Sequence, residues 1–266
     1  MQSSDINAME ALSNAEWLQL LEDCANEADE VSRHYFNSAS LQVEHKGDST
    51  PVSEADIKIE RLIRDTLLKR FPSLGVIGEE FESCDASLPF KLIIDPIDGT
   101  SNFIRAIPIY GTLLAIEKHG EIVAGLISNG FTKERWQAFK GGGAFYNAKP
   151  ISVSTISDLS QSQAFYGSLF GNEARGDFTK LTNFLSHTKR QRGIGDYLMH
   201  MWVAAGFGEC AIDFALKPWD LGPLGIIVTE AGGHVSQVDG SEFSIYEGSI
   251  LSSNGLFHDT LVQNYS

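Results

Sequence analysis

One nine-residue run, from Leu92 to Thr100, constrains this chain more than any other feature. It reads Leu-Ile-Ile-Asp-Pro-Ile-Asp-Gly-Thr, so a short apolar strand ends on two carboxylates, Asp95 and Asp98, followed by a glycine and a hydroxyl. Hard divalent cations prefer carboxylate and carbonyl oxygens, and the Ile97 carbonyl adds a neutral one. The glycine and threonine that close the run can start a helix whose free N–H groups favour a phosphate at the same spot. The run therefore predicts a metal and phosphate site at the end of a buried strand.

Two other segments place acids in comparable positions. Gly75 to Glu80 is a second short apolar stretch that ends in carboxylates, among them Glu79. Asp220 closes the segment Lys217-Pro218-Trp219-Asp220 and stands where a helix N-cap or first-turn residue would stand. Taken singly, each acid is explained by a turn or a helix cap. The three acidic segments together favour a metal site.

Composition sets the class of protein. With 266 residues and 42% hydrophobic content, the chain can bury a full core, and it holds no run of eighteen apolar residues that could cross a bilayer. The net charge of −15 argues against a nucleic acid partner. It would also repel a small phosphate ester, and bound divalent ions would resolve that conflict by reversing the local charge.

The chain start and the cysteines indicate a compartment. Residues Met1 to Met9 are polar and acidic, unlike a secretory signal or a transit peptide. Cys24, Cys84 and Cys210 are widely spaced and odd in number, which fits reduced thiols better than a disulfide framework. We therefore expect a cytoplasmic protein that does not associate with a membrane.

Hydrophobic periodicity predicts a layered α/β protein without repeats. We expect two subdomains, residues 1–150 with most metal ligands and residues 151–266 with Asp220 and the specificity residues, and a metal site between them. Helices are expected at 17–31, 54–70 with Ser53 as cap, 178–187 and after Asp196, and strands at 112–117, 122–127, 135–139, 164–168, up to 194, and 209–214.

Three motifs in this order resemble the inositol monophosphatase family of magnesium-dependent, lithium-sensitive phosphatases. They are Gly-Glu-Glu at 78–80, Asp-Pro-Ile-Asp-Gly-Thr at 95–100, and Trp-Asp at 219–220 with the trailing Glu-Ala-Gly-Gly. The resemblance runs from Lys46 to Gly240. It implies an αβαβα sandwich of the sugar-phosphatase type, a phosphoric monoester hydrolase that uses a metal-activated water, and a homodimer.

The resemblance also implies a set of metal ligands. About two to three Mg²⁺ ions per active site are expected, as in two-metal phosphatases. Glu79, Asp95 and the Ile97 carbonyl would hold the first ion. Asp95, Asp98 and Asp220 would hold the second.

Catalytic roles follow from the same resemblance. Glu79 and Thr100 would form a hydrogen-bonded pair that takes a proton from the attacking water, with Asp56 bonded to the Thr100 hydroxyl. Lys46 would lie near metal and phosphate, and the Gly99 and Thr100 N–H groups would bind phosphate oxygens. The four residues that end at Asp56 also form a capping-box pattern, and both roles can hold at once.

The substrate is the open question at this stage. Inositol monophosphatases usually carry Gly-Ser-Ala-Ala where this chain has Gly195-Asp196-Tyr197-Leu198, and the Gly-Asp form is similar to the histidinol-phosphate phosphatase branch of the family. Asp213 matches a family position that normally bears a substrate-contacting glutamate, and Asp98 and Asp220 are expected to contact the substrate as well. Extra carboxylates at Asp196 and Asp213 would favour the ammonium and imidazole of histidinol phosphate, although Asp196 alone is also explained as a helix cap.

Three functions therefore stand at this point. We expect a Mg²⁺-dependent histidinol-phosphate phosphatase, an enzyme of histidine biosynthesis. The alternative is a phosphatase of the same chemistry acting on inositol 1-phosphate or on another sugar or nucleotide phosphate. A non-catalytic regulatory protein that kept the fold is the remote alternative.

Overall fold

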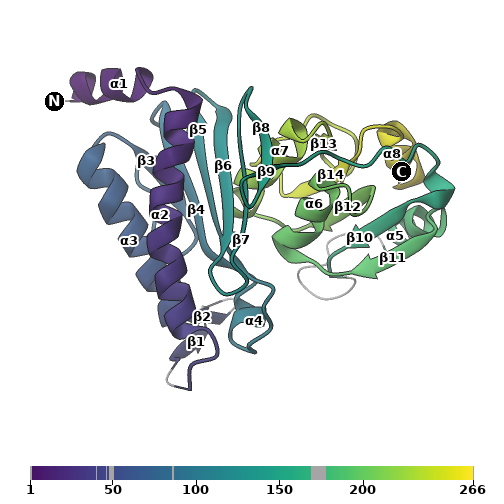
Figure 1. Cartoon of the computed structure of the whole chain (residues 1–266), viewed down its shortest axis with the longest axis horizontal. Coiled ribbons are helices and arrows are strands. Elements are labelled where there is room, and N and C mark those ends of the chain that lie inside the picture. Colours follow the sequence, from purple (N-terminus) through teal and green to yellow (C-terminus); the bar gives the residue numbers. More distant parts are fainter. Residues whose placement is uncertain are drawn as a thin grey trace.

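Five layers of helices and sheets make up the molecule (Figure 1). The computed structural model describes residues 2–39, 41–45, 47, 51–85, 87–168 and 178–265, so Lys46 lies outside the described residues. The order across the molecule is a helix pair, a seven-stranded sheet, a second helix pair, a five-stranded sheet and a third helix pair. This is the αβαβα arrangement that the motifs predicted.

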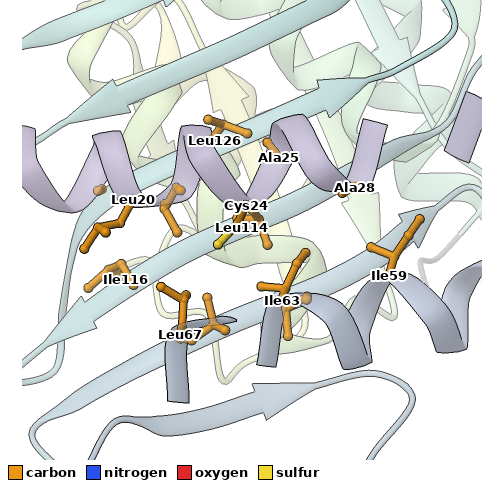
Figure 2. Packing of buried hydrophobic residues seen from close by; sticks show 14 of the residues in the cluster. Leu20, Cys24, Ala25, Ala28, Ile59, Ile63, Leu67, Leu114, Ile116 and Leu126 are labelled. Carbon is orange, nitrogen blue, oxygen red and sulfur yellow. The ribbon is translucent and has the colours of Figure 1, made fainter. Parts of the chain in front are cut away.

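The first layer is formed by α2 (Asn14–Tyr35) and α3 (Glu54–Arg70). Both helices begin with a capping box, in which the N-cap serine and the acid three residues later bond to each other's backbone N–H. One apolar stripe on each helix packs against the same face of the first sheet, with Cys24 and Ile63 among its members (Figure 2). The short helix α1 (Gln2–Glu10) precedes this layer.

The strands of the first sheet lie side by side in the order of the sequence. Only β3 and β4 are parallel, and each later neighbour is antiparallel. Its strands are β3 (Gly75–Gly78), β4 (Phe90–Asp98), β5 (Gly111–Lys118), β6 (Glu121–Asn129), β7 (Glu134–Phe139), β8 (Gly143–Tyr146) and β9 (Lys149–Pro150). A separate pair, β1 (Val43–His45) and β2 (Pro51–Ser53), leads into α3.

The second sheet has the order β11-β10-β12-β14-β13. Its first three strands are parallel, so their carboxyl ends meet at one edge, where open α/β sheets form their binding crevices. The strands are β10 (Gln163–Tyr166), β11 (Arg190–Gly193), β12 (Cys210–Phe214), β13 (His234–Ser236) and β14 (Ser249–Ser253). The outer helices are α5 (Phe178–Ser186) and α8 (His258–Tyr265), and the single turn η1 (Leu159–Gln161) precedes β10.

The middle layer joins the two sheets. It consists of α6 (Asp196–Ala204) and α7 (Pro218–Glu230), which pack on each other. α7 comes from the C-terminal half of the chain but contacts β4, β5, β6 and β7 of the first sheet as well as β13 and β14 of the second. Both helices therefore start close to the ends of strands from different sheets, which is where the site is built.

Most predicted elements are present with ends shifted by a few residues. The helix expected at 54–70 has these bounds, and the hairpin around His119-Gly120 joins β5 to β6. The helix expected after Gly99 exists only as one turn, α4 (Thr100–Phe103). Among the described residues, no helix combines the length and the apolar composition needed to cross a membrane.

Candidate metal and phosphate site

A bulge at the end of β4 creates the core of the site. Asp95 lies opposite Leu113 and Asp98 opposite Gly111, so three steps on β4 match two steps on β5. The extra residue lets both carboxylates turn toward one point. Asp220, in the first turn of α7, reaches the same point, and ligand oxygens of the three aspartates lie within 4.8 Å of one another.

Without a cation, burial and mutual repulsion make the ionised form of these three carboxylates unfavourable. Burial raises the pKa of Asp95 well above its usual value, and repulsion from Glu79, Asp98 and Asp220 adds to the rise. Burial likewise raises the pKa of Asp220 from 3.8 to about 7, although the Lys217 N–H, which donates to Asp220 at 2.7 Å, opposes the change. Burial and mutual repulsion thus favour the protonated form of these carboxyls, and a bound cation would favour the ionised form.

The donor set fits a hard divalent cation. Asp95 Oδ1 is a buried acceptor without a hydrogen-bond partner among the described residues. A buried carboxylate oxygen left in this state costs free energy that a coordinated cation would recover. Glu79 lines the same cleft and is the first charge, after burial, to raise the pKa of Asp95, but it is outside the close group of three aspartates.

Two acceptors lie within hydrogen-bond distance of the Thr100 hydroxyl. Its hydroxyl lies 2.9 Å from the Ile97 carbonyl oxygen and 3.2 Å from Asp56 Oδ1. The other carboxylate oxygen of Asp56 accepts the Ser53 N–H at 2.9 Å and the Ser53 hydroxyl at 2.6 Å. Asp56 thus caps α3 and contacts Thr100 at once. Burial raises the pKa of Asp56 to about 6, against the lowering effect of the Ser53 hydrogen bonds.

Gly99 occupies a position that only glycine fits well. Its φ of +81° is left-handed, and an added Cβ would lie 2.9 Å from the Ile109 carbonyl oxygen. The chain can therefore turn from β4 into α4 at once, and the Gly99 and Thr100 backbone lines the cleft beside the aspartates.

The start of α6 connects the second half of the chain to this site. Asp98 Oδ2 accepts the Tyr197 N–H at 2.7 Å, and Asn102 donates its side-chain amide to Asp196 Oδ2 at 2.7 Å. The N-cap of α6 is Gly195, without a side-chain cap bond, and the first-turn N–H goes to Asp98. Asp196 itself has a φ of +52°, a backbone conformation that asparagine and aspartate tolerate best and that is frequent at functional sites. The structure thus gives Asp196 a place beside Asn102 and assigns the helix cap to other residues.

Asp213 enters the cleft from the end of β12. Its Oδ1 accepts the N–H of Phe214 at 2.9 Å. Gly167 leaves room for this carboxylate, since an added Cβ there would lie 2.5 Å from Asp213 Oδ1. The Gly195 backbone approaches Gly167 as well, so Asp213 and the start of α6 face one side of the cleft.

The cleft that unites these groups measures about 710 Å³. Six carboxylates line it, and the described lining residues include neither lysine nor arginine. Of the residues predicted from sequence, the cleft gathers all except Asp56, which lies buried behind Thr100, and Lys46, which is outside the described residues. The six lining acids are Glu79, Asp95, Asp98, Asp196, Asp213 and Asp220.

Sequence reasoning missed two kinds of residue here. Asn102 lies two residues after the Asp-Gly-Thr motif, and its amide was a usable signal. Tyr166 and Phe214 line the cleft at the ends of β10 and β12. Neither side chain is charged, so the sequence did not mark them as site residues.

Comparisons with known proteins support the motif reading. A sequence model of the inositol monophosphatase family matches residues 13–266, a longer span than the motifs indicated. A histidinol-phosphatase from Mycobacterium tuberculosis is 35% identical over 243 residues, which cover 90% of this chain and 93% of that protein. An inositol-1-monophosphatase from Rhizobium meliloti is 34% identical over 230 residues, with 84% and 86% covered.

A solved structure agrees in fold. The extragenic suppressor protein suhB from Bartonella henselae superimposes with a TM-score of 0.86 at 29% identity and covers 94% of this chain and 98% of that one. The layered fold is therefore one that a solved structure already shows.

Proposed function

The chain belongs to the inositol monophosphatase family, and from this premise we propose that it is a Mg²⁺-dependent phosphatase that hydrolyses histidinol phosphate. The enzyme class, a phosphoric monoester hydrolase, comes with the family and its named relatives. The metal, the residue roles and the ester are the parts that we propose. We also propose the division of labour expected from sequence, with residues 1–150 carrying most metal ligands and residues 151–266 carrying Asp220 and the specificity residues.

One observation carries the choice of substrate: the cleft has six carboxylates and no described basic lining residue. About two Mg²⁺ ions would offset roughly four of these charges, as in two-metal phosphatases. Asp196 and Asp213 add two carboxylates from the C-terminal half of the chain, with Asp196 accepting from the Asn102 amide and Asp213 from the Phe214 N–H. A leaving group with an ammonium and an imidazole matches this charge, and inositol carries only hydroxyls.

We assign the metal to Glu79, Asp95, the Ile97 carbonyl, Asp98 and Asp220. When bound, Mg²⁺ would lower the pKa of a water and withdraw charge from the phosphate oxygens. The family resemblance suggests two to three ions, and the close group of Asp95, Asp98 and Asp220 supports at least one.

The chain's own groups would position the reactants. The Thr100 hydroxyl donates toward Asp56, so its oxygen can accept a hydrogen bond from the attacking water, and Glu79 would take the proton that this water loses. The Gly99 and Thr100 N–H groups would bind phosphate oxygens, whose negative charge grows during displacement. Asp196 and Asp213 would bind the cationic part of the alcohol that leaves.

Asp196→Asn tests the substrate assignment. The amide keeps the shape but removes the charge, so binding of histidinol phosphate should weaken by about 1.5–3 kcal/mol, the value of a hydrogen bond to a charged group. The measurement is kcat/KM for histidinol phosphate relative to inositol 1-phosphate. Equal losses for both esters would show that Asp196 only supports the start of α6.

The homodimer remains part of the proposal. Phe131 is 53% exposed and Ile107 is 40% exposed, and Phe131 packs on Phe36, which gives the first half of the chain an apolar surface. A second copy of this chain is the occupant we propose. Analytical ultracentrifugation of the wild type and of Phe131→Asp tests it, because a dimer should dissociate in the variant.

A further inference from the structure

The position of Glu79 depends on the turn that follows β3. Glu79 follows β3, the edge strand of the first sheet, and an antiparallel bridge between Val76 and Cys84 closes the loop that contains it. A proposed metal ligand and proton acceptor must be fixed within about half an ångström to act. Within that loop, residues 78–82 also contact α3.

A buried ion pair on α3 contacts this turn. Glu60 is fully buried and is bonded to Arg64, one helical turn later, with 2.8 Å from Arg64 Nε and 2.7 Å from its Nη2 to Glu60 Oε1. The other oxygen of Glu60 accepts the Glu80 N–H at 2.8 Å. Arg64 donates its two terminal nitrogens to the Phe81 carbonyl at 3.1 Å and the Glu82 carbonyl at 3.2 Å.

Gly78 allows this close approach on the other side of Glu79. An added Cβ at Gly78 would lie 2.2 Å from Glu60 Oε1 and 2.9 Å from Arg64 Nη2. The backbone on both sides of Glu79 is thus in contact with the same pair. A shift of the pair would move Glu79 with it.

The same face of α3 also holds the other half of the proposed proton acceptor. Asp56, Glu60 and Arg64 are spaced four residues apart and so share one face of the helix. Asp56 contacts Thr100, and the ion pair contacts the turn of Glu79. One rigid helix therefore fixes the distance between the two groups.

Stability alone does not account for a charged pair in this place. Removing two ions from water costs several kcal/mol each, and apolar residues of similar size in place of a buried pair are often neutral or stabilising. Outside α3, the hydrogen bonds of Glu60 and Arg64 go to the backbone of residues 80–82, in the turn that bears Glu79.

We propose that Glu60 and Arg64 are positioning residues, which set Glu79 for metal binding and proton transfer through the backbone of residues 78–82. This inference rests on the proposed function of Glu79. It adds two residues from α3 that lie outside the cleft and do not touch the substrate.

The test uses the double variant Glu60→Met/Arg64→Met, which removes the pair without leaving one charge buried alone. Arg61→Met is the matched control, because Arg61 is exposed on the same helix and also stacks near Phe81. Mg²⁺ binding is measured by calorimetry without substrate, the melting temperature in chelator, and kcat and KM with Mg²⁺. Arg64→Lys keeps the charge but loses the two-pronged contact and serves if the double variant does not fold.

We expect the double variant to bind Mg²⁺ at least tenfold more weakly and to lose at least tenfold in kcat, with KM changed by less than about threefold. Arg64→Lys should show a smaller loss in the same two quantities, and Arg61→Met should match the wild type. A folded double variant, or a folded Arg64→Lys enzyme, with wild-type Mg²⁺ affinity and kcat would overturn the positioning role alone. A wild-type enzyme that binds no Mg²⁺ would overturn the proposed function first and this inference with it.

Discussion

Replacing Asp220 by asparagine should make the metal-free protein more stable while removing its activity. In the absence of a cation, burial raises the pKa of this carboxyl from 3.8 to about 7. A carboxyl whose pKa is higher in the folded state destabilises the fold once the unfolded chain ionises, and this effect grows from about pH 4 to about pH 7 and is constant above. The amide variant carries no such charge, and its side-chain oxygen can still accept the Lys217 N–H that Asp220 accepts.

The size of the effect follows from the shift. At about 1.36 kcal/mol for each pKa unit, the ionised carboxylate costs the metal-free fold on the order of 4 kcal/mol at about pH 8 and roughly 1.5 kcal/mol at about pH 5. For a chain of this length, about 1 kcal/mol corresponds to roughly 2 °C in melting temperature. Asp220→Asn should therefore melt about 8 °C above the wild type near pH 8 and about 3 °C above it near pH 5.

The assay is thermal unfolding in chelator at both pH values, repeated with Mg²⁺. Binding to the folded state should stabilise the wild type by about 2.7 kcal/mol at a Mg²⁺ concentration near 100 times Kd, whereas the variant should gain little and hydrolyse little substrate. A variant that melts below the wild type in chelator near pH 8 would refute the reasoning. So would a variant with full turnover.

Three further predictions concern other groups of the site. Asp95→Asn should lower turnover by orders of magnitude in a steady-state phosphate-release assay while circular dichroism stays unchanged, because it removes charge from the metal site and not volume from the core; full activity would contradict the metal assignment. Thr100→Val should lower kcat by roughly two to four decades and KM far less, and an unchanged kcat with a shifted melting temperature would assign Thr100 to structure alone. Asn102→Ala should reduce kcat/KM for histidinol phosphate more than for inositol 1-phosphate, because it removes the donor that holds Asp196; equal losses would separate Asn102 from specificity.

The sequence predicts the elements whose signals are local. A capping box and an apolar stripe predict the α3 helix, and two runs rich in β-forming residues around a turn predict the β5–β6 hairpin. The short strands β13 and β14 were not predicted, because three to five residues with mixed polarity carry little periodic signal.

The site residues that could be predicted are likewise those whose contacts are local in sequence. The motif of β4 already placed Asp95 and Asp98 together, since the bulge that aims them lies within a few residues. The contact of Asn102 with Asp196 joins residues 94 positions apart, and pattern alone does not specify such a pairing. Glu60 and Arg64 have the i,i+4 spacing that is also common for surface ion pairs, and only the packing of α3 against the turn of Glu79 reveals that Glu60 is buried.

The most direct test of the central claim is the ratio of kcat/KM for histidinol phosphate to that for inositol 1-phosphate, measured with the wild-type enzyme in Mg²⁺ and in chelator. Our account predicts at least a tenfold preference for histidinol phosphate, because about 1.4 kcal/mol, less than one hydrogen bond to a charged group, already gives a factor of ten. It predicts no hydrolysis of either ester in chelator. A preference for inositol 1-phosphate would contradict the substrate assignment, and hydrolysis that persists in chelator would contradict the metal site on which the account is built.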